Sequence, residues 1–179
     1  MTVQVNYTNR DKSRDPHVIA LFTEDKFQIK NIGNFLSKNE TSYVEKILKN
    51  KKNTKENIIS FNINEKTTLI LISIKKYLKG SDVENLGAEF YNFIKKNSFK
   101  DVSIIAESIK SKPGKDFIGR FMHGLKLKSY EFNIYKSKKF TACMTQTIEA
   151  RLNKTIKKKL LISNIILRKI FFFIEICHF

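Results

Sequence analysis

The chain has 179 residues, of which 41% are hydrophobic, and a formal net charge of +17. This length and composition fit one globular domain with a sizeable core and exclude a disordered chain. The only cysteines are Cys143 and Cys177, so residues 1–139 contain neither a disulfide framework nor a thiolate metal site. The N-terminal residues lack a basic stretch followed by an apolar one, which predicts a cytoplasmic protein without an export signal.

The positive charge comes mainly from lysine. A basic surface attracts nucleic acid or anionic membranes, but arginine is the residue that reads guanine or clamps a phosphate with two parallel hydrogen bonds. The chain is also rich in Ile, Asn, Phe and Lys, which an A/T-rich coding sequence supplies. We therefore favour genome composition as the origin of the charge, and a basic nucleic-acid-binding module remains the alternative. The arginines are Arg10, Arg14, Arg120, Arg151 and Arg168.

Five segments in the first 110 residues have the pattern of β-strands. Residues 3–7 alternate between apolar and polar side chains, and residues 17–22 form a short apolar run typical of a strand buried on both faces. Residues 57–63 and 67–74 are predicted to pair as a hairpin. Residues 101–106 form the last buried strand. Strands that alternate with helices indicate a layered α/β sheet covered on both faces.

Three helices are expected between these strands, and two of them begin with a capping-box pattern. Ser37 and Glu40 form the first box, and Ser81 and Glu84 form the second. In the second helix Gly87 and the adjacent alanine should let the helix approach its sheet closely. The predicted apolar faces are Tyr43, Val44, Ile47 and Leu48 in the first helix, Val83, Leu86, Phe90 and Ile94 in the second, and Phe117, Ile118, Phe121, Met122 and Leu125 in the third.

No residue is assigned a catalytic, cofactor-binding or metal-binding role. The sequence has no His-Glu-x-x-His motif, and His17, His123 and His178 are scattered along it. We expect His17 to be structural and His123 to be a surface or packed residue. The segment 111–115 resembles a phosphate-binding loop but lacks its first glycine and the Ser/Thr after the lysine, which favours a turn.

Two pairs of carboxylates could serve in acid/base chemistry. Glu24 and Asp25 lie in a polar segment that reads as a turn. Asp82 and Glu84 lie at the start of a predicted helix, where acidic side chains complement the helix dipole. Neither pair has the pattern of a general acid and base.

One segment resembles a known family signature. It combines Gly124, Ser129, Tyr130, Phe132 and the run Tyr135-Lys136-Ser137, and we expect a helix to end near Gly124 and lead into a strand. This pattern resembles the G-L-x-L-x-S-Y-x-F-x-x-Y-K-S motif that closes the N-terminal domain of the leucyl (cytosol) aminopeptidase family. The run 86–89, Leu-Gly-Ala-Glu, resembles the family's L-G-A segment. The chain departs from the family at Ser73, Lys75 and Lys128, where glycine is usual.

The resemblance implies a macro-domain-like α/β fold over residues 1–139, with a mixed sheet flanked by helices. It also implies that catalysis belongs to a later domain, which binds two divalent metals, zinc or manganese, and forms most of the family's homohexamer contacts. That domain's N-T-D-A-E-G-R-L motif does not occur in this sequence. We therefore expect a non-catalytic, truncated fragment of a metalloaminopeptidase. A macro-like fold also suggests ADP-ribose binding as a function. The six glycines, however, do not cluster into a phosphate-binding loop.

Residues 140–179 read as a basic and apolar tail without resemblance to the family. Its lysine and phenylalanine runs are what A-rich and T-rich codons give in a shifted reading frame, so we favour a frameshift soon after Lys139. A membrane span is not expected, because a span needs ~20 mostly apolar residues and polar or charged residues interrupt this segment. An interfacial helix or a helix docked on the sheet remains open. The interrupting residues are Ser163, Asn164, Arg168, Lys169 and Glu175.

Overall fold

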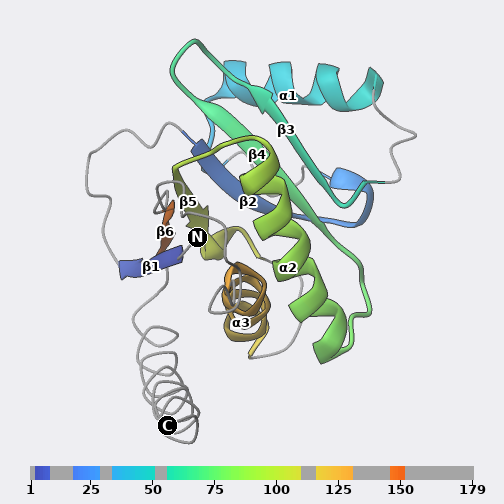
Figure 1. The fold of residues 1–179 in the computed structure, drawn as a ribbon. Helices are drawn as coiled ribbons and strands as arrows, with labels where there is room; N and C mark the ends of the chain where they lie inside the picture. The colour runs from blue at the N-terminus through green and yellow to red at the C-terminus, as the bar shows by residue number, and fades with distance from the viewer. Residues whose placement is uncertain are drawn as a thin grey trace, which may run out of the picture.

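A six-stranded mixed sheet runs through the protein, with helices on both of its faces (Figure 1). The computed structural model describes residues 3–8, 18–28, 34–50, 56–109, 116–130 and 146–151. The strands occur in the order β1-β6-β5-β2-β4-β3. All neighbouring pairs are parallel except β3 and β4, which form an antiparallel hairpin. The strands are β1 (Val3–Thr8), β2 (Val18–Glu24), β3 (Ile58–Asn62), β4 (Thr68–Ile74), β5 (Asp101–Ile105) and β6 (Gln146–Arg151).

The five strands predicted from the sequence are confirmed to within two residues at each end. The continuous apolar run in β2 has the predicted cause, because Ala20, Leu21 and Phe22 are almost completely buried between two layers of side chains. The hairpin of β3 and β4 is confirmed as well. The expectation for His17 lies outside the described residues.

The sheet extends beyond the boundary that the sequence places after Lys139. Strand β6 lies between β1 and β5, and pairs with both of them in parallel. Residues 146–151, which the sequence assigns to the tail, therefore form a strand of the sheet. The other residues after position 139 lie outside the described residues, and the expectation of a shifted reading frame for them stays a prediction.

One face of the sheet is covered by α1 (Lys38–Asn50). Its predicted capping box is confirmed: the Ser37 backbone N–H donates to Glu40 Oε2 over 2.8 Å, and the Glu40 N–H donates to Ser37 Oγ over 3.3 Å. Val44 is fully buried and Leu48 packs beside it, but Tyr43 is 47% exposed and does not belong to the buried face. The apolar stripe of α1 is thus narrower than its sequence suggests.

The opposite face is covered by α2 (Gly80–Lys96) and α3 (Phe117–Ser129). The predicted apolar stripes of both helices are confirmed, since every residue in them is buried. An aromatic pair joins this layer to the sheet: the ring centres of Phe22 in β2 and Phe121 in α3 lie 5.2 Å apart with the planes at 84°. A second pair joins the two helices, since the ring centres of Phe90 and Phe121 lie 5.5 Å apart. Edge-to-face packing of this kind adds to the stabilisation from burial.

The capping box predicted at Ser81 and Glu84 is wrong in position. The helix begins two residues earlier, and the Asp82 carboxylate accepts a hydrogen bond of 2.9 Å from the Lys79 backbone N–H. Ser81 lies inside the first turn and is exposed. A carboxylate three residues into a helix satisfies a free backbone donor whatever residue stands at the cap, which is why the serine was a misleading marker.

The roles predicted for two glycines also need correction. A Cβ on Gly87 would overlap the backbone carbonyl oxygen of Phe121, so this glycine brings α2 close to α3 and not to the sheet. Gly124 does not end the third helix, because α3 continues to Ser129. Its absent side chain leaves room for the backbone of Glu84. The strand expected after Tyr130 lies outside the described residues.

Candidate functional site

The carboxyl ends of three parallel strands lie side by side along one edge of the sheet. Ligands commonly bind at the carboxyl ends of strands in open α/β folds. Strand β2 pairs in parallel with both β4 and β5, and Glu24 at its end lies opposite Ile74 at the end of β4. Three described segments follow these strand ends: the short helix η1 (Asp25–Phe27), residues 75–79, and the short helix η3 (Ala106–Ser108). These segments form the edge at which a functional site is to be sought.

The segment after β2 has an unusual backbone. Lys26 and Phe27 both have φ of 56°, in the left-handed region that residues with a Cβ rarely adopt. Phe27 is buried in the core under α1, and Gln28 bridges back to Glu24. Burial of this ring compensates for the strained turn. The polar turn predicted for Glu24 and Asp25 is not what the structure shows, because Glu24 is the last residue of β2 and Asp25 is the exposed first residue of η1.

The segment after β5 holds a buried serine, Ser108, that serves the fold. Its Oγ accepts a hydrogen bond of 2.8 Å from the backbone N–H of Phe22 and donates one of 2.6 Å to the carbonyl oxygen of Ile105. The residue is 3% exposed. Both polar functions of the hydroxyl are thus used to tie η3 to β2. Ser108 is not available as a nucleophile in this arrangement.

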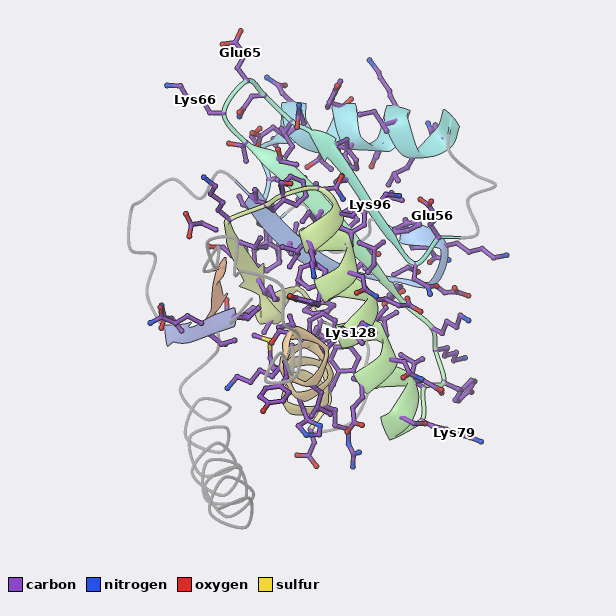
Figure 2. The ribbon with its side chains drawn as sticks, viewed as in Figure 1. Glu56, Glu65, Lys66, Lys79, Lys96 and Lys128 are labelled. Atoms are coloured by element: carbon purple, nitrogen blue, oxygen red, sulfur yellow. The ribbon has the colours of Figure 1, made fainter. Side chains whose placement is uncertain are left out.

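The segment after β4 is the most basic part of this edge. It contains Lys75, Lys76 and Lys79 without an intervening acid, and Tyr77 between them is 84% exposed. Lys76 Nζ lies 5.6 Å from the centre of the Tyr77 ring, within the range of a cation–π contact. Figure 2 shows the Lys79 side chain extending away from the body of the protein. An exposed ring among lysines has the chemistry of a site for an anionic, aromatic ligand.

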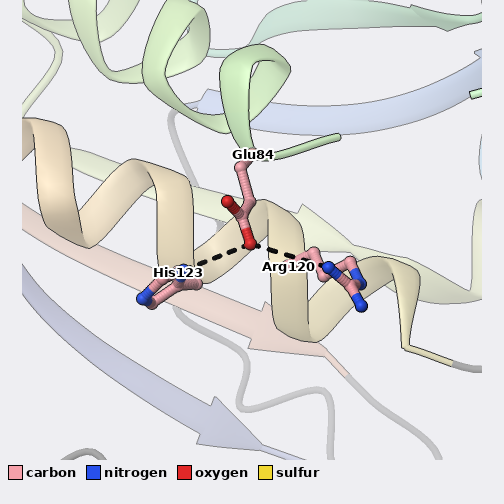
Figure 3. Close-up of polar contacts among 3 residues, drawn as sticks. All are labelled: Glu84, Arg120 and His123. Carbon is pink, nitrogen blue, oxygen red and sulfur yellow. Dashed lines mark ion pairs between the residues drawn. The ribbon is translucent and has the colours of Figure 1, made fainter. Parts of the chain in front are cut away.

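A second polar group lies where α2 and α3 cross (Figure 3). Glu84 Oε1 of α2 is 3.8 Å from an Arg120 guanidinium nitrogen and 3.4 Å from His123 Nδ1, both on α3. Arg120 and His123 are three residues apart and so share one face of their helix. The close helix crossing brings the single carboxylate to both of them. This cluster is the candidate that the sequence does not reveal, since Glu84 and Arg120 are far apart in the chain.

The exposure of this cluster favours a structural role. The side chains of Glu84 and His123 are about one third exposed, at 34% and 32%, and that of Arg120 is 52% exposed. A catalytic His–carboxylate pair needs a nucleophile or bound water within hydrogen-bond reach. Pairs this exposed contribute only about 0–1 kcal/mol to stability. We therefore assign the cluster to the registry of α2 against α3, which agrees with the expectation of a packed or surface histidine at His123.

The remaining sequence-based expectations concern metals and lysines. Within the part of the chain that the structure describes, no three His, Cys, Asp or Glu side chains gather as a metal site would require. In the same residues no helix has the length and apolar character needed to cross a bilayer. The labelled lysines of Figure 2 do not gather at one place, since Lys66 and Lys79 lie at opposite ends of the view. The segment 111–115 and the histidines other than His123 lie outside the described residues.

Comparison with known proteins finds no matching family model and no matching curated protein. Solved structures do match. A tomato leucine aminopeptidase superimposes with a TM-score of 0.57 and 9% identity over 89% of this chain. The match covers 35% of the aminopeptidase, so the chain spans about a third of that enzyme's length.

Macrodomains superimpose as well. The macro domain of ganglioside-induced differentiation associated protein 2 matches with a TM-score of 0.62 and 12% identity, over 88% of this chain and 82% of that one. The DarG macrodomain of Mycobacterium tuberculosis matches with a TM-score of 0.56 and 11% identity, over 84% and 99%. Likenesses at such low identity carry the fold alone. The chain has a mixed α/β fold that resembles macrodomains and part of a leucine aminopeptidase.

Proposed function

We propose that this chain is the non-catalytic N-terminal domain of a leucine aminopeptidase-type protein and does not hydrolyse peptides by itself. In this proposal the two metals and their ligands belong to a further domain, and the described residues serve folding, assembly or substrate access in the cytoplasmic enzyme. The observation that carries the proposal is the extent of the structural match, which covers most of this chain and about a third of the aminopeptidase.

Two features of the described residues support the proposal. The buried Ser108 uses its hydroxyl to hold η3 against β2. The glycine of the signature has a structural use, since Gly124 lies at the crossing of α2 and α3. A role in packing is what a supporting domain requires of such residues.

The coding DNA offers the most direct test. We expect one of the three reading frames beyond the codon for Lys139 to encode a domain with the N-T-D-A-E-G-R-L motif. Absence of that motif from all three frames would contradict the assignment to an aminopeptidase. In parallel, the purified chain should release no leucine from a leucyl amide with added zinc or manganese, and clear metal-dependent release above a blank would show that a catalytic site is present after all.

ADP-ribose binding, a use of macro-like folds, is not expected of this chain. Such binding needs backbone N–H groups that approach a diphosphate closely, which glycine-rich loops allow. Among the described residues the glycines lie in helices α2 and α3. Titration calorimetry with ADP-ribose should therefore give no saturable heat. Saturable binding would instead support a macrodomain function for this chain.

A nucleic-acid-binding module is the second candidate, and one observation favours it. Lys75, Lys76 and Lys79 lie close in sequence to the exposed Tyr77, and Lys76 Nζ lies 5.6 Å from the centre of its ring. Single-stranded nucleic acid binds to such combinations through phosphate contacts and base stacking. Fluorescence anisotropy with a labelled single strand tests this use: Tyr77→Ala should weaken binding while Tyr43→Ala, an exposed tyrosine on α1, should not. Equal affinities of both variants would exclude a site at Tyr77.

A further inference from the structure

Strand β3 (Ile58–Asn62) is the outermost strand at its end of the sheet. Its pairing with β4 shows which of its backbone N–H and C=O groups are not used in the hairpin. The Ser73 N–H donates to the Asn57 carbonyl oxygen over 2.8 Å, and the Ile63 N–H donates to the Thr67 carbonyl oxygen over 3.0 Å. Since hydrogen-bonding positions alternate along an antiparallel pair, Ile58, Ser60 and Asn62 direct their N–H and C=O groups away from β4. No described residue pairs with this outer edge.

Proteins usually protect a free strand edge with lysine, proline, a bulge or a covering segment. The sequence of β3 is Ile-Ile-Ser-Phe-Asn, which contains neither a charged residue nor a proline. Its register with β4 is continuous over all five residue pairs, so the strand has no bulge. Figure 1 shows β3 as the last labelled strand on its side of the sheet. The edge is therefore a ready acceptor for another strand.

We propose that β3 is an interface at which two copies of this chain pair, in antiparallel orientation about a two-fold axis at Ser60. In this register Ser60 lies opposite the partner's Ser60, and Ile58 lies opposite the partner's Asn62. Each of these pairs can exchange two backbone hydrogen bonds, because their groups all face outward. The same patch serves both copies, as a two-fold interface requires.

The residues beside the strand are compatible with this register. Glu56 comes to lie opposite the partner's Asn64, so no like charges face one another directly among the described residues. The apolar layers also continue on both sides: Ile58 belongs to the core under α2 and α3, and Ile59 to the core under α1. A second copy thus extends the sheet with matching layers. The proposal does not depend on the function proposed above.

Backbone pairing can be tested at Ser60 without disturbing β4. Ser60→Pro removes an N–H that points outward, which an edge strand tolerates, whereas Ser60→Ala keeps it. In sedimentation equilibrium over a wide concentration range, the unchanged chain and Ser60→Ala should form dimers with similar affinity. Ser60→Pro should raise the dissociation constant about tenfold or more, since each copy loses a hydrogen bond. Thermal melting monitored by circular dichroism confirms that each variant is folded.

A charge exchange tests the register and covers the case in which the proline variant does not fold. Ser60→Lys and Ser60→Asp each place like charges opposite one another at the two-fold axis, so each variant alone should be mainly monomeric. An equimolar mixture should recover dimers. A monomeric unchanged chain at all concentrations would overturn the proposal, and so would a mixture that associates no better than its components.

Salt provides an independent readout. Two copies that each carry +17 repel at long range, so added salt should strengthen their association. Association through a bridging nucleic acid would weaken with salt and disappear after nuclease treatment. That outcome would also overturn the proposal.

Discussion

Gly124 of α3 lies against the backbone carbonyl oxygen of Glu84 in α2, and a Cβ at this position would overlap that oxygen. Gly87 of α2 has the same relation to the backbone of Phe121 in α3. Each helix therefore contributes one glycine to a crossing in which the two backbones touch. This crossing also brings Glu84 within reach of Arg120 and His123.

Gly124→Ala should destabilise the protein. The added methyl group must push apart two helices, and overpacking of this kind costs about 1–3 kcal/mol. Urea unfolding measures the change. Gly119→Ala, in the same helix but half-buried, is the matched control and should be neutral or stabilising by up to about 1 kcal/mol. Equal stabilities of the two variants would mean that the helices do not cross at Gly124.

Phe90→Ala should be among the most damaging substitutions in α2. The ring is completely buried and packs against Phe121, so its removal leaves a cavity that costs on the order of 3–5 kcal/mol. Asn92→Ala, on the exposed side of the same helix, should change stability by less than about 0.5 kcal/mol. A loss below about 1 kcal/mol for Phe90→Ala would place this helix face outside the core.

The start of α2 can be located by two substitutions. Asp82→Ala removes the acceptor of the Lys79 N–H and should cost about 0.5–2 kcal/mol. Ser81→Ala should change stability little, because Ser81 is exposed within the first turn. Thermal unfolding of both variants measures the difference. A larger loss of stability for Ser81→Ala than for Asp82→Ala would indicate that Ser81 caps the helix.

Ser108→Ala should destabilise the junction of β2 and η3. The substitution leaves the backbone N–H of Phe22 without its acceptor inside the core, which costs about 1–3 kcal/mol. Ser108→Thr retains a hydroxyl and is the conservative comparison. The measurement is denaturant unfolding, together with exchange protection of the Phe22 amide. Unchanged protection in Ser108→Ala would contradict the hydrogen bond.

Two truncations separate the sheet from the rest of the C-terminal segment. Removal of everything after Lys139 deletes β6 and should lower the melting temperature strongly, since about 1 kcal/mol corresponds to roughly 2–8 °C in a domain of this size. Removal of residues 152–179 keeps β6 and should leave the transition nearly unchanged. This result would differ from what a shifted reading frame soon after Lys139 implies, since out-of-frame residues would contribute no strand to the sheet. Equal melting temperatures after both truncations would exclude β6 from the sheet.

The sequence predicts best what is decided locally. The capping box at Ser37 and Glu40 depends on residues three positions apart, and the strand at β2 depends on one apolar run. The stripes of α2 and α3 follow from helical spacing. Such features are visible because the signal and the structure it specifies occupy the same few residues.

The sequence-based predictions are wrong where contacts with a distant segment determine the local structure. Gly124 resembles a helix terminator, yet its neighbour is Glu84 on another helix. Strand β6 carries a weak pattern of its own and takes its conformation from β1 and β5, which lie far away in the chain. The cluster of Glu84, Arg120 and His123 exists only because two helices cross. No spacing rule within one segment contains this information.

The strand order has a consequence for the growing polypeptide on the ribosome. Among the described strands, β1 pairs only with β6, and Val3 lies opposite Gln146. Strand β1 is therefore synthesised long before its partner and cannot pair until β6 has been translated up to about position 151. The hairpin of β3 and β4 can form much earlier. During this interval β1 is an unpaired strand, and we expect a ribosome-bound chain arrested before position 146 to leave it accessible to chaperones or proteases.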